Sequence, residues 1–335
     1  MSAGPRPGSV SVLFPQQPVD GRSILPFGRL VRDSCAVRLW MGQSLRVESH
    51  PVLAYLAGAG CEISVGIGVG LMVLRHPLDA ALQARSLAAL TGQPVTVGYG
   101  AADARFVSGL RGSPYDRPAK AVEEYLTIMQ ALLRGERVTH HGSLYQMDQA
   151  LPPLEHPPVE VGAGVLREAM ARAAGRAADV AITWLTPASY VRDTLVPALA
   201  EGAGGRRKPP RVASVVHVAI DRPGRSPMLL AQSGAGSHLR AAHYTDMLRR
   251  AGLDVHSADP VAGARELVEE GVFVYGKASE VAAAIREQHA MGVDEVVLNP
   301  TAVSNLFGTD EAFRDLEEIL AEIDSGGGHG ARQAL

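Results

Sequence analysis

Two glycines stand where a buried strand passes into a helix, and this pattern can bind a phosphate. Gly162 and Gly164 follow the apolar run that begins at Val159, and a helix with one apolar face is predicted over residues 166–175. Glycines at such a junction leave backbone N–H groups accessible at the positive end of a helix, which forms an anion site. The same residues also fit a tight strand-to-helix turn that holds no ligand, so both interpretations stay open.

A second glycine-rich stretch, residues 62–74, predicts a buried strand in which glycines alternate with branched residues. Glycine weakens a strand because it has no side chain to pack and loses much backbone entropy. Its repetition therefore indicates a bulge, a flat ligand close to the backbone, or close packing inside a barrel. These alternatives also stay open on the residues alone.

Several aromatic and basic side chains could contact a substrate. His238, His243 and Tyr244 have the spacing i, i+5 and i+6, which places no pair of metal ligands on one helix face, so we predict no metal site. These three either line the substrate pocket as part of a lid or lie on a surface helix. Trp40 ends a predicted strand and is either core or a stacking wall, and we favour the wall. Arg38, if it points inward, needs a carboxylate or a ligand as its partner.

Alternating strands and helices must position these residues. Strands are predicted over residues 9–14, 36–40, 62–74, 95–98, 159–161, 178–184, 211–220 and 295–298, with helices between them, and residues 99–113 are predicted to be irregular. About eight strands in alternation with helices favour a closed parallel α/β barrel, the (β/α)8 TIM barrel, over an open doubly wound sheet. In such a barrel, ligands bind at the C-terminal ends of the strands.

The bulk composition argues against several classes of function. The 335 residues are 46% hydrophobic with a formal net charge of −3, so we expect no nucleic-acid partner. Two cysteines, Cys35 and Cys61, indicate a reducing compartment rather than a disulfide scaffold. With no signal-peptide pattern and no apolar stretch of about 18 residues, we expect a cytoplasmic protein without membrane contact. We expect one domain over residues 1–325 and a disordered tail over residues 326–335.

A set of short motifs makes the chain resemble the bacterial luciferase-like superfamily of flavin- and deazaflavin-dependent oxidoreductases. The motifs, in chain order, are Arg75-His76-Pro77, Thr91-Gly92, the run 117–126, Gly142-Ser143-Leu144-Tyr145, the run 157–163, Ala177-Ala178-Asp179, the run 274–281 and the run 292–299. Each motif is weak alone, but their order and spacing together are fairly specific. The resemblance covers residues 8 to 325.

The resemblance implies a TIM barrel with an insertion after strand seven, and FMN or coenzyme F420 at its C-terminal mouth. It implies that the backbone of Gly162, Ala163 and Gly164 cradles the cofactor phosphate. It further implies that a bulge at Ser64, Val65, Gly66 and Ile67 backs the cofactor ring, with Trp184 and Gly98 near the ring edge and Trp40 as a wall. The members commonly pair through their second and third helices, so a homodimer is expected.

One departure from the family pattern bears on the chemistry. After strand two, deazaflavin-dependent members often carry an acidic residue or a histidine, whereas this chain has Gln43. We place Gln43 at the catalytic position, where its amide can hydrogen-bond a cofactor carbonyl or hydroxyl but cannot act as a general base. This argues against alcohol oxidation, which requires a proton acceptor.

These points give a leading hypothesis and two alternatives. The leading hypothesis is an F420-dependent reductase that transfers hydride to a C=C or C=N bond of a small-molecule or peptide-derived substrate in natural-product metabolism. The composition, which is rich in alanine, glycine and arginine as in actinobacterial proteins, favours F420 over FMN. The alternatives are a two-component monooxygenase that uses reduced FMN from a separate cofactor reductase, and a non-catalytic partner subunit.

Overall fold

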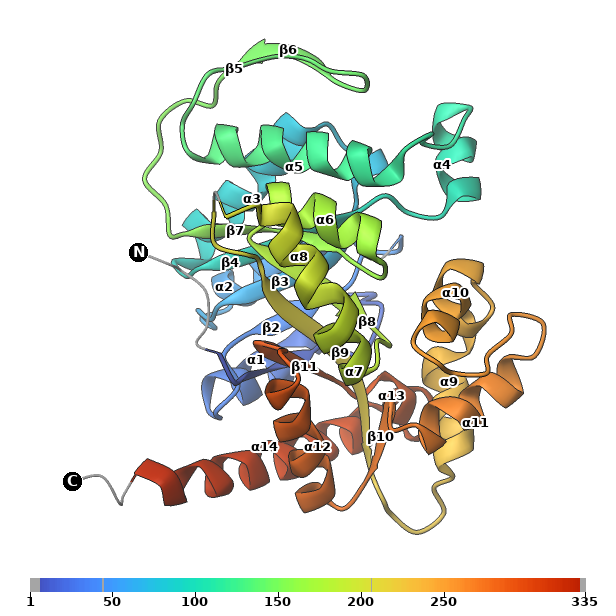
Figure 1. The fold of residues 1–335 in the computed structure, drawn as a ribbon. Helices are drawn as coiled ribbons and strands as arrows, with labels where there is room; N and C mark the ends of the chain where they lie inside the picture. The colour runs from blue at the N-terminus through green and yellow to red at the C-terminus, as the bar shows by residue number, and fades with distance from the viewer. Residues whose placement is uncertain (1–6, 44, 206, 332–335) are drawn as a thin grey trace.

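The computed structural model of the protein describes residues 7–43, 45–205 and 207–331. Within these residues, eight parallel strands close into a barrel, and helices surround it (Figure 1). The barrel strands are β1 (Ser9–Leu13), β2 (Leu39–Met41), β3 (Val65–Leu71), β4 (Val95–Gly100), β7 (Val159–Gly164), β8 (Val180–Trp184), β9 (Arg211–Ile220) and β11 (Glu295–Asn299). Pairing of β8 with β9 and of β11 with β1 closes the ring, which excludes the open sheet and confirms the predicted barrel.

The helices follow the strands as the alternating pattern predicts. Around the barrel lie α1 (Leu25–Arg32), α2 (Ser49–Gly58), α3 (Pro77–Thr91), α4 (Ala104–Arg111), α5 (Pro118–Leu133), α6 (Glu168–Ala177), α7 (Ala188–Tyr190), α8 (Val196–Ala203), α12 (Ala278–Ala290), α13 (Thr301–Phe307) and α14 (Thr309–Ala331). Several of these helices begin at capping residues that can be recognised in the sequence. For example, the His76 ring accepts from the amide of Leu78 at the start of α3, where Pro77 needs no hydrogen bond for its nitrogen.

An insertion follows β9, the seventh barrel strand, as the family resemblance implied. It contains α9 (Pro227–Leu239), α10 (Ala242–Arg250) and α11 (Pro260–Glu269), and it lies beside the mouth of the barrel (Figure 1). The short strand β10 (Phe273–Gly276) returns the chain and pairs with the second half of β9. A separate hairpin, β5 (Val138–His141) and β6 (Gln146–Gln149), packs on α5.

The end of the barrel where the strands begin holds a plug of buried charges. Arg211 pairs with Glu160 at 2.6 Å and with Glu295 at 2.5 Å. Arg38 lies 3.4 Å from Glu160, so it points inward and has the carboxylate partner that its position required. Two positive and two negative charges thus neutralise one another out of contact with water, where an unpaired charge would be strongly destabilising.

Two predicted irregular segments are helical, which corrects the sequence-based expectation. Residues 99–113 contain α4, whose start is capped by Asp103 accepting from the amides of Arg105 and Phe106. The predicted disordered tail begins instead as the last turns of α14, which continues to Ala331, while residues 332–335 lie outside the described part of the chain. Both stretches contain glycines that lower helix propensity, and local propensity alone therefore pointed away from a helix.

Candidate active site

The C-terminal ends of the barrel strands lie on the side of the molecule that carries α4 and the insertion (Figure 1), and this end of the barrel is called the mouth. Two loops at this mouth hold a non-glycine residue in the left-handed region. Ala102 after β4 has φ 64° and Leu185 after β8 has φ 55°, and the described residues contain no other non-glycine residue with positive φ. Such conformations are unfavourable by about 1–3 kcal/mol each and persist where the surroundings enforce them, often at functional sites.

The predicted phosphate cradle at Gly162, Ala163 and Gly164 lies inside strand β7 and not at a turn. All three residues pair with β8 within the sheet, and the amide of Val165 still donates to the carbonyl of Ile182 at 2.8 Å. The strand is therefore longer than predicted. The turn into α6 follows at residues 165–167, so the amides at the start of a helix are those after Arg167.

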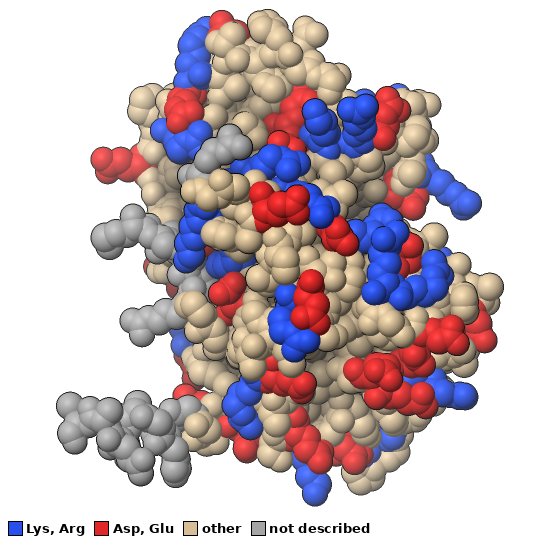
Figure 2. Space-filling view, viewed as in Figure 1, with Lys and Arg blue, Asp and Glu red and all other residues tan. Residues whose placement is uncertain are grey.

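Charged side chains gather around this turn. Arg167, the residue before α6, lies 3.0 Å from Asp246 of α10, and Arg250 lies 3.0 Å from the same carboxylate oxygen. The hydrogen bond from Arg250 lowers the pKa of Asp246, with a further contribution from Arg167. A group of basic side chains is visible over α10 in Figure 2. Two arginines beside the first turn of a helix can hold a phosphate, because both the charges and the helix dipole favour an anion.

The irregular segment of β3 lies further along the strand than predicted. Ser64 is before the strand, and its hydroxyl donates to the carbonyl of Pro94 at 2.6 Å, at the end away from the mouth. Val65, Gly66 and Ile67 pair regularly with β4, and the register shifts only between Ile67 and Gly70, around a cis peptide between Gly68 and Val69. The residue that this bulge presents toward the mouth is Val69, whose side chain would contact a Cβ built on Gly98, Gly100 or Gly164 at 3.1–3.4 Å.

The alternating glycines make room for large side chains in the barrel interior. A Cβ on Gly66 would overlap the ring of Trp40, and one on Gly98 would overlap Ile182. Trp40 is fully buried, and its Nε1 donates to Glu295 Oε1 at 2.7 Å. Trp40 is therefore part of the core and not a wall at the mouth, because its ring lies in the space that the β3 glycines vacate. Close packing, rather than a flat ligand, accounts for Gly66, Gly98 and Gly162.

A cluster of aromatic rings lines the mouth beside the insertion. Trp184 at the end of β8 stacks on His238 of α9 with ring centroids 5.4 Å apart, and it meets His217 of β9 edge-on at 5.9 Å. Tyr244 of α10 lies 4.8 Å from both His238 and His243. The structure thus brings together Trp184, His238, His243 and Tyr244, all predicted as site residues, and adds His217.

The histidines of this mouth cluster are neutral near pH 7. Burial lowers the pKa of His217 to about 3, and burial together with the nearby His243 lowers the pKa of His238 to about 4. Burial also raises the pKa of Tyr244, which keeps its hydroxyl protonated. The cluster therefore offers hydrogen bonds without net charge.

The tautomer of His217 follows from its contact with Asn299 of β11. The amide of Thr301 donates to Asn299 Oδ1 at 3.0 Å, so the amino group of Asn299 faces His217 Nε2 at 3.3 Å. Because an amino group only donates, Nε2 must accept, and the proton of the neutral ring resides on Nδ1.

Three buried nitrogens in the mouth cluster have no hydrogen-bond partner among the described residues. They are Trp184 Nε1, His217 Nδ1 and His238 Nδ1. Buried polar atoms are nearly always paired, and an unpaired one is unfavourable by about 1–3 kcal/mol. The residues present therefore fit a bound molecule with hydrogen-bonding oxygens or nitrogens, and the indole N–H of Trp184 can only donate to it.

Gln43 lies on the other side of the mouth, after β2. A Cβ placed on Gly70 would lie 3.7 Å from Gln43 Oε1 and 3.0 Å from the ring of Tyr99, so both side chains border the same part of β3. Burial raises the pKa of Tyr99 to about 12. Close to it, Arg75 binds Glu48 at 3.1 Å and Gln83 at 3.0 Å. This side of the mouth thus contains charged side chains that are held by an ion pair and hydrogen bonds, unlike the neutral cluster on the opposite side.

The described residues contain no group of three or more histidine, cysteine or acidic side chains placed to hold a metal ion. None of the described helices combines the length and hydrophobicity needed to cross a bilayer.

The sequence of residues 29–295 matches the model of the luciferase-like monooxygenase family. The chain belongs to this family. It is thereby placed among the luciferase-like oxidoreductases that depend on F420 or a flavin, as the motifs predicted.

Several solved structures share the fold of this chain at low sequence identity. The coenzyme F420-dependent tetrahydromethanopterin reductase from Methanopyrus kandleri is 19% identical, with TM-score 0.73 over 96% of this chain and 99% of that one. An F420-dependent secondary alcohol dehydrogenase in complex with an F420–acetone adduct is 15% identical, with TM-score 0.74 over 94% and 98%. The oxygenating constituent of 3,6-diketocamphane monooxygenase from Pseudomonas putida, in complex with FMN, is 15% identical, with TM-score 0.66 over 94% and 97%.

Among curated proteins, the uncharacterized protein Rv0940c of Mycobacterium tuberculosis is 28% identical over 132 residues. The match covers 39% of this chain and 46% of that protein. The chain thus spans less than half the length of the curated relative that it matches.

Sequence reasoning about this luciferase-like chain missed His217, Asn299, Arg167 and Val69. His217 carries a usable signal, since it is a single polar residue within the apolar run of β9 and must face either the barrel interior or the helices. Val69 and Arg167 carry no such signal, because their roles depend on where β3 loses its register and where β7 ends.

Proposed function

We propose that this protein is an F420-dependent reductase that transfers hydride to a C=C or C=N bond of a substrate in natural-product metabolism. The observation that carries the proposal is the indole N–H of Trp184, which is buried at the barrel mouth and has no acceptor among the residues that the structure describes. It lies between two neutral histidines, His217 and His238. A donor held in such a water-poor site can hydrogen-bond the atom on which negative charge develops.

The chain offers a place for each part of the cofactor. The turn at residues 165–167, with Arg167 and Arg250 beside it, would hold the phosphate, and binding would replace the carboxylate of Asp246. The bulge that presents Val69 would lie against the ring. When bound, F420 supplies the hydride, while the protein supplies orientation and a dry environment.

Two features support reduction over alcohol oxidation. Gln43 has no group that accepts a proton at neutral pH, and it would hydrogen-bond the cofactor or substrate. His238, with a pKa of about 4, is a weak base at pH 7. A general base works best when its pKa lies near the operating pH, so the residues of this mouth are better suited to polarising a double bond than to removing a hydroxyl proton.

Two further observations favour F420 over FMN. The two F420-dependent neighbours superpose with TM-scores of 0.73 and 0.74, and the FMN-containing one with 0.66. The paired arginines at the α6 turn also suit an anionic tail that extends beyond one phosphate.

Equilibrium dialysis of the full-length protein against F420 and against FMN tests the cofactor. We expect F420 to bind, and we expect the protein to oxidise reduced F420 under anaerobic conditions when an enone or imine acceptor is present. Tight FMN binding without F420 binding would overturn the choice. Oxygen consumption that requires reduced FMN from a separate reductase would establish the two-component monooxygenase instead, and binding of neither cofactor would leave a non-catalytic partner subunit.

We also propose a homodimer that pairs through α2 and α3. These helices expose three large apolar side chains, Tyr55 at 42%, Leu82 at 40% and Leu90 at 66% of their full areas. Light scattering on the purified protein tests this, and a monomer at micromolar concentration would contradict it. Replacement of Leu90 by Arg is expected to weaken a dimer without unfolding the chain, because the side chain is mostly exposed.

A further inference from the structure

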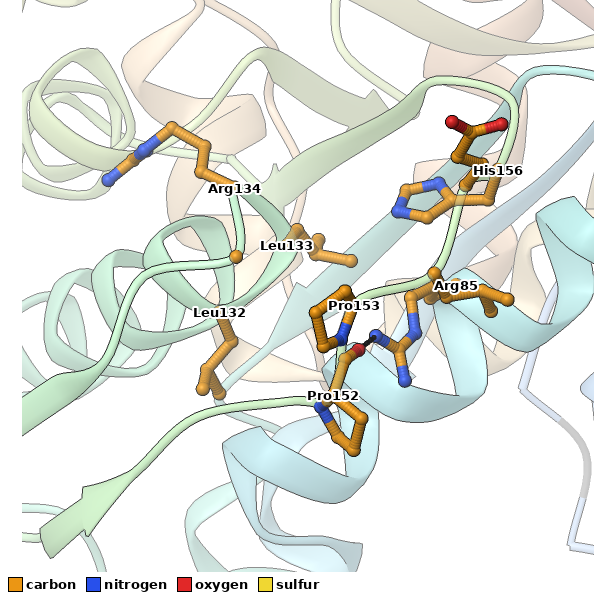
Figure 3. Close-up of a pocket in the computed structure, with 10 residues that line it drawn as sticks. Arg85, Leu132, Leu133, Arg134, Pro152, Pro153 and His156 are labelled. Carbon is orange, nitrogen blue, oxygen red and sulfur yellow. Dashed lines mark hydrogen bonds between the residues drawn. The ribbon is translucent and has the colours of Figure 1, made fainter.

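A cavity of about 380 Å³ opens at the end of the barrel opposite the mouth. It lies between α3, the last turn of α5 and the proline-rich segment 152–156 that leads into β7, and Figure 3 shows its lining. This volume is within the lower part of the usual range for small-molecule sites, about 300–1,000 Å³. The cavity is separate from the proposed cofactor site, so a ligand bound there is independent of the proposed function.

Arg85 of α3 is the charged group inside this cavity. The residue is only 8% exposed, and its Nη1 donates to the carbonyl of Pro152 at 2.6 Å, as the dashed line in Figure 3 marks. Its Nε is buried without a partner, and no carboxylate of the described chain lies within ion-pair distance of it. The buried arginines of the barrel plug, Arg38 and Arg211, by contrast, each contact Glu160.

An unpaired buried guanidinium is unfavourable, because burial removes its hydration and a single carbonyl does not replace a counter-charge. The planar group presents its remaining N–H donors in a fork that matches a carboxylate. The neighbouring Arg134 does not fill this role, since it is bound to Glu136 at 2.6 Å and points away from the cavity in Figure 3.

The rest of the lining is mostly apolar. Leu132, Leu133, Leu154, Pro152 and Pro153 form the walls, with His156 and Glu155 at the edge. The last turn of α5 also lies here, and the negative end of its dipole opposes added negative charge, more strongly for a multiply charged anion than for a singly charged one. The cavity therefore suits a ligand with one negative charge and an aliphatic body.

We propose that this cavity binds a short aliphatic carboxylate, with the carboxylate on Arg85 and the alkyl chain against Leu133 and Leu154. The carboxylate would neutralise the one buried arginine of the described chain that lacks a counter-charge. The alkyl chain would bury apolar surface of the cavity wall that is otherwise exposed to water.

Isothermal titration calorimetry of the full-length protein with octanoate tests the proposal. We expect saturable binding with one site, and we expect Arg85→Gln to weaken it by about tenfold or more, because a charge-assisted hydrogen bond is lost. Arg137→Gln is the matched control, since Arg137 is exposed and paired with Asp148 on the hairpin. Octan-1-ol, which has the chain without the charge, is expected to bind far more weakly than octanoate.

A second variant keeps the test decisive if Arg85→Gln unfolds the protein. Leu154 is 52% exposed, so Leu154→Asp should fold normally and should also weaken octanoate binding by repulsion and loss of apolar wall. The proposal would be overturned if Arg85→Gln, Leu154→Asp and the unchanged protein bound octanoate with equal affinity, or if the unchanged protein did not bind octanoate. Loss of octanoate binding in Trp184→Phe would place the ligand at the mouth. Full competition by inorganic phosphate would indicate a site for any small anion. Either result would overturn the proposal.

Discussion

The charged plug and the mouth cluster, at opposite ends of the barrel interior, differ in how their buried polar groups are paired. At the end where the strands begin, Arg211 binds Glu160 and Glu295, and Glu295 also accepts from Ser11 and Trp40. At the mouth, the buried nitrogens of Trp184, His217 and His238 have no partner in the described chain. The paired carboxylates of the plug therefore stabilise the fold, while the unpaired nitrogens of the mouth cluster are available to a ligand.

Removing one partner of the charged plug should have the largest effect on stability. Arg211→Met leaves Glu160 and Glu295 with too little positive charge, and a broken buried pair costs about 3–5 kcal/mol. We expect the free energy of unfolding to fall by about that amount in urea titrations followed by circular dichroism. Arg137→Met, which removes an exposed pair with Asp148, should cost much less than Arg211→Met, because water screens an exposed pair. Similar losses in the two variants would show that the plug is not the stabilising element.

The two ends should also lose stability in different pH ranges. The lowered pKa of His238, about 4 in the folded protein, lies below the value near 6.5 of an unfolded histidine, so the unfolded chain binds more protons between these values. The contribution of His238 should therefore be lost as the pH falls from about 6.5 to about 4, and it amounts to at most about 3.4 kcal/mol. His238→Gln should reduce the decline of the unfolding free energy in this range, and the part that remains should come from His217, whose pKa of about 3 makes it lose stability over the same range.

The carboxylates of the plug should affect the pH dependence of stability only at lower pH, below the range in which the histidines titrate. Burial opposes ionisation of Glu160, but the hydrogen bonds and charge of Arg211 outweigh it and lower the pKa of Glu160. Its contribution is present above the unfolded value of about 4.3 and is lost as the pH falls through the lower folded value. A decline between pH 6.5 and 4 that persists in His238→Gln and disappears in Arg211→Met would reverse this assignment.

Replacement by alanine should destabilise the protein more at a glycine of the barrel interior than at a glycine near the mouth. Gly66→Ala places a methyl group in the ring of fully buried Trp40, and such overpacking costs about 1–3 kcal/mol. Gly164→Ala, on β7 close to the mouth, meets Val69 at an ordinary 3.4 Å and should change stability much less. Thermal unfolding of both variants measures the difference, and equal losses would contradict the packing explanation for the interior glycines.

The smallest expected effect on stability comes from Trp184→Phe. Removal of a buried N–H that has no partner among the described residues favours the folded state, whereas the smaller phenyl ring loses packing area, so the unfolding free energy should change little in either direction. F420 affinity in equilibrium dialysis should nevertheless fall by about tenfold, because the donor for the ligand is gone. Unchanged affinity together with unchanged stability would remove Trp184 from the proposed site.

The boundaries between elements limited what the sequence could say about the site. The glycines of β7 fit a turn as well as a strand, and only pairing with β4 and β8 shows that the strand continues through Gly164. Likewise, the alternation of glycine in β3 is compatible with a ligand or with packing, and the position of Trp40 decides for packing. Strand register is a property of two chain segments at once, so one segment cannot reveal it.

The barrel, the insertion after β9 and the family could all be predicted from the sequence, because hydrophobic periodicity and the order of short motifs are local features. Trp184 is predicted near the cofactor ring, and His238, His243 and Tyr244 are predicted in a substrate lid or on a surface helix. The folded chain shows that the four rings lie together, and their role in a site stays a prediction. The folded chain was needed to show that Trp40 is core, that Arg38 has a carboxylate partner and that Arg85 has none among the described residues. Whether a buried charge or ring is paired depends on side chains from strands and helices far apart in sequence, and these meet only when the barrel closes.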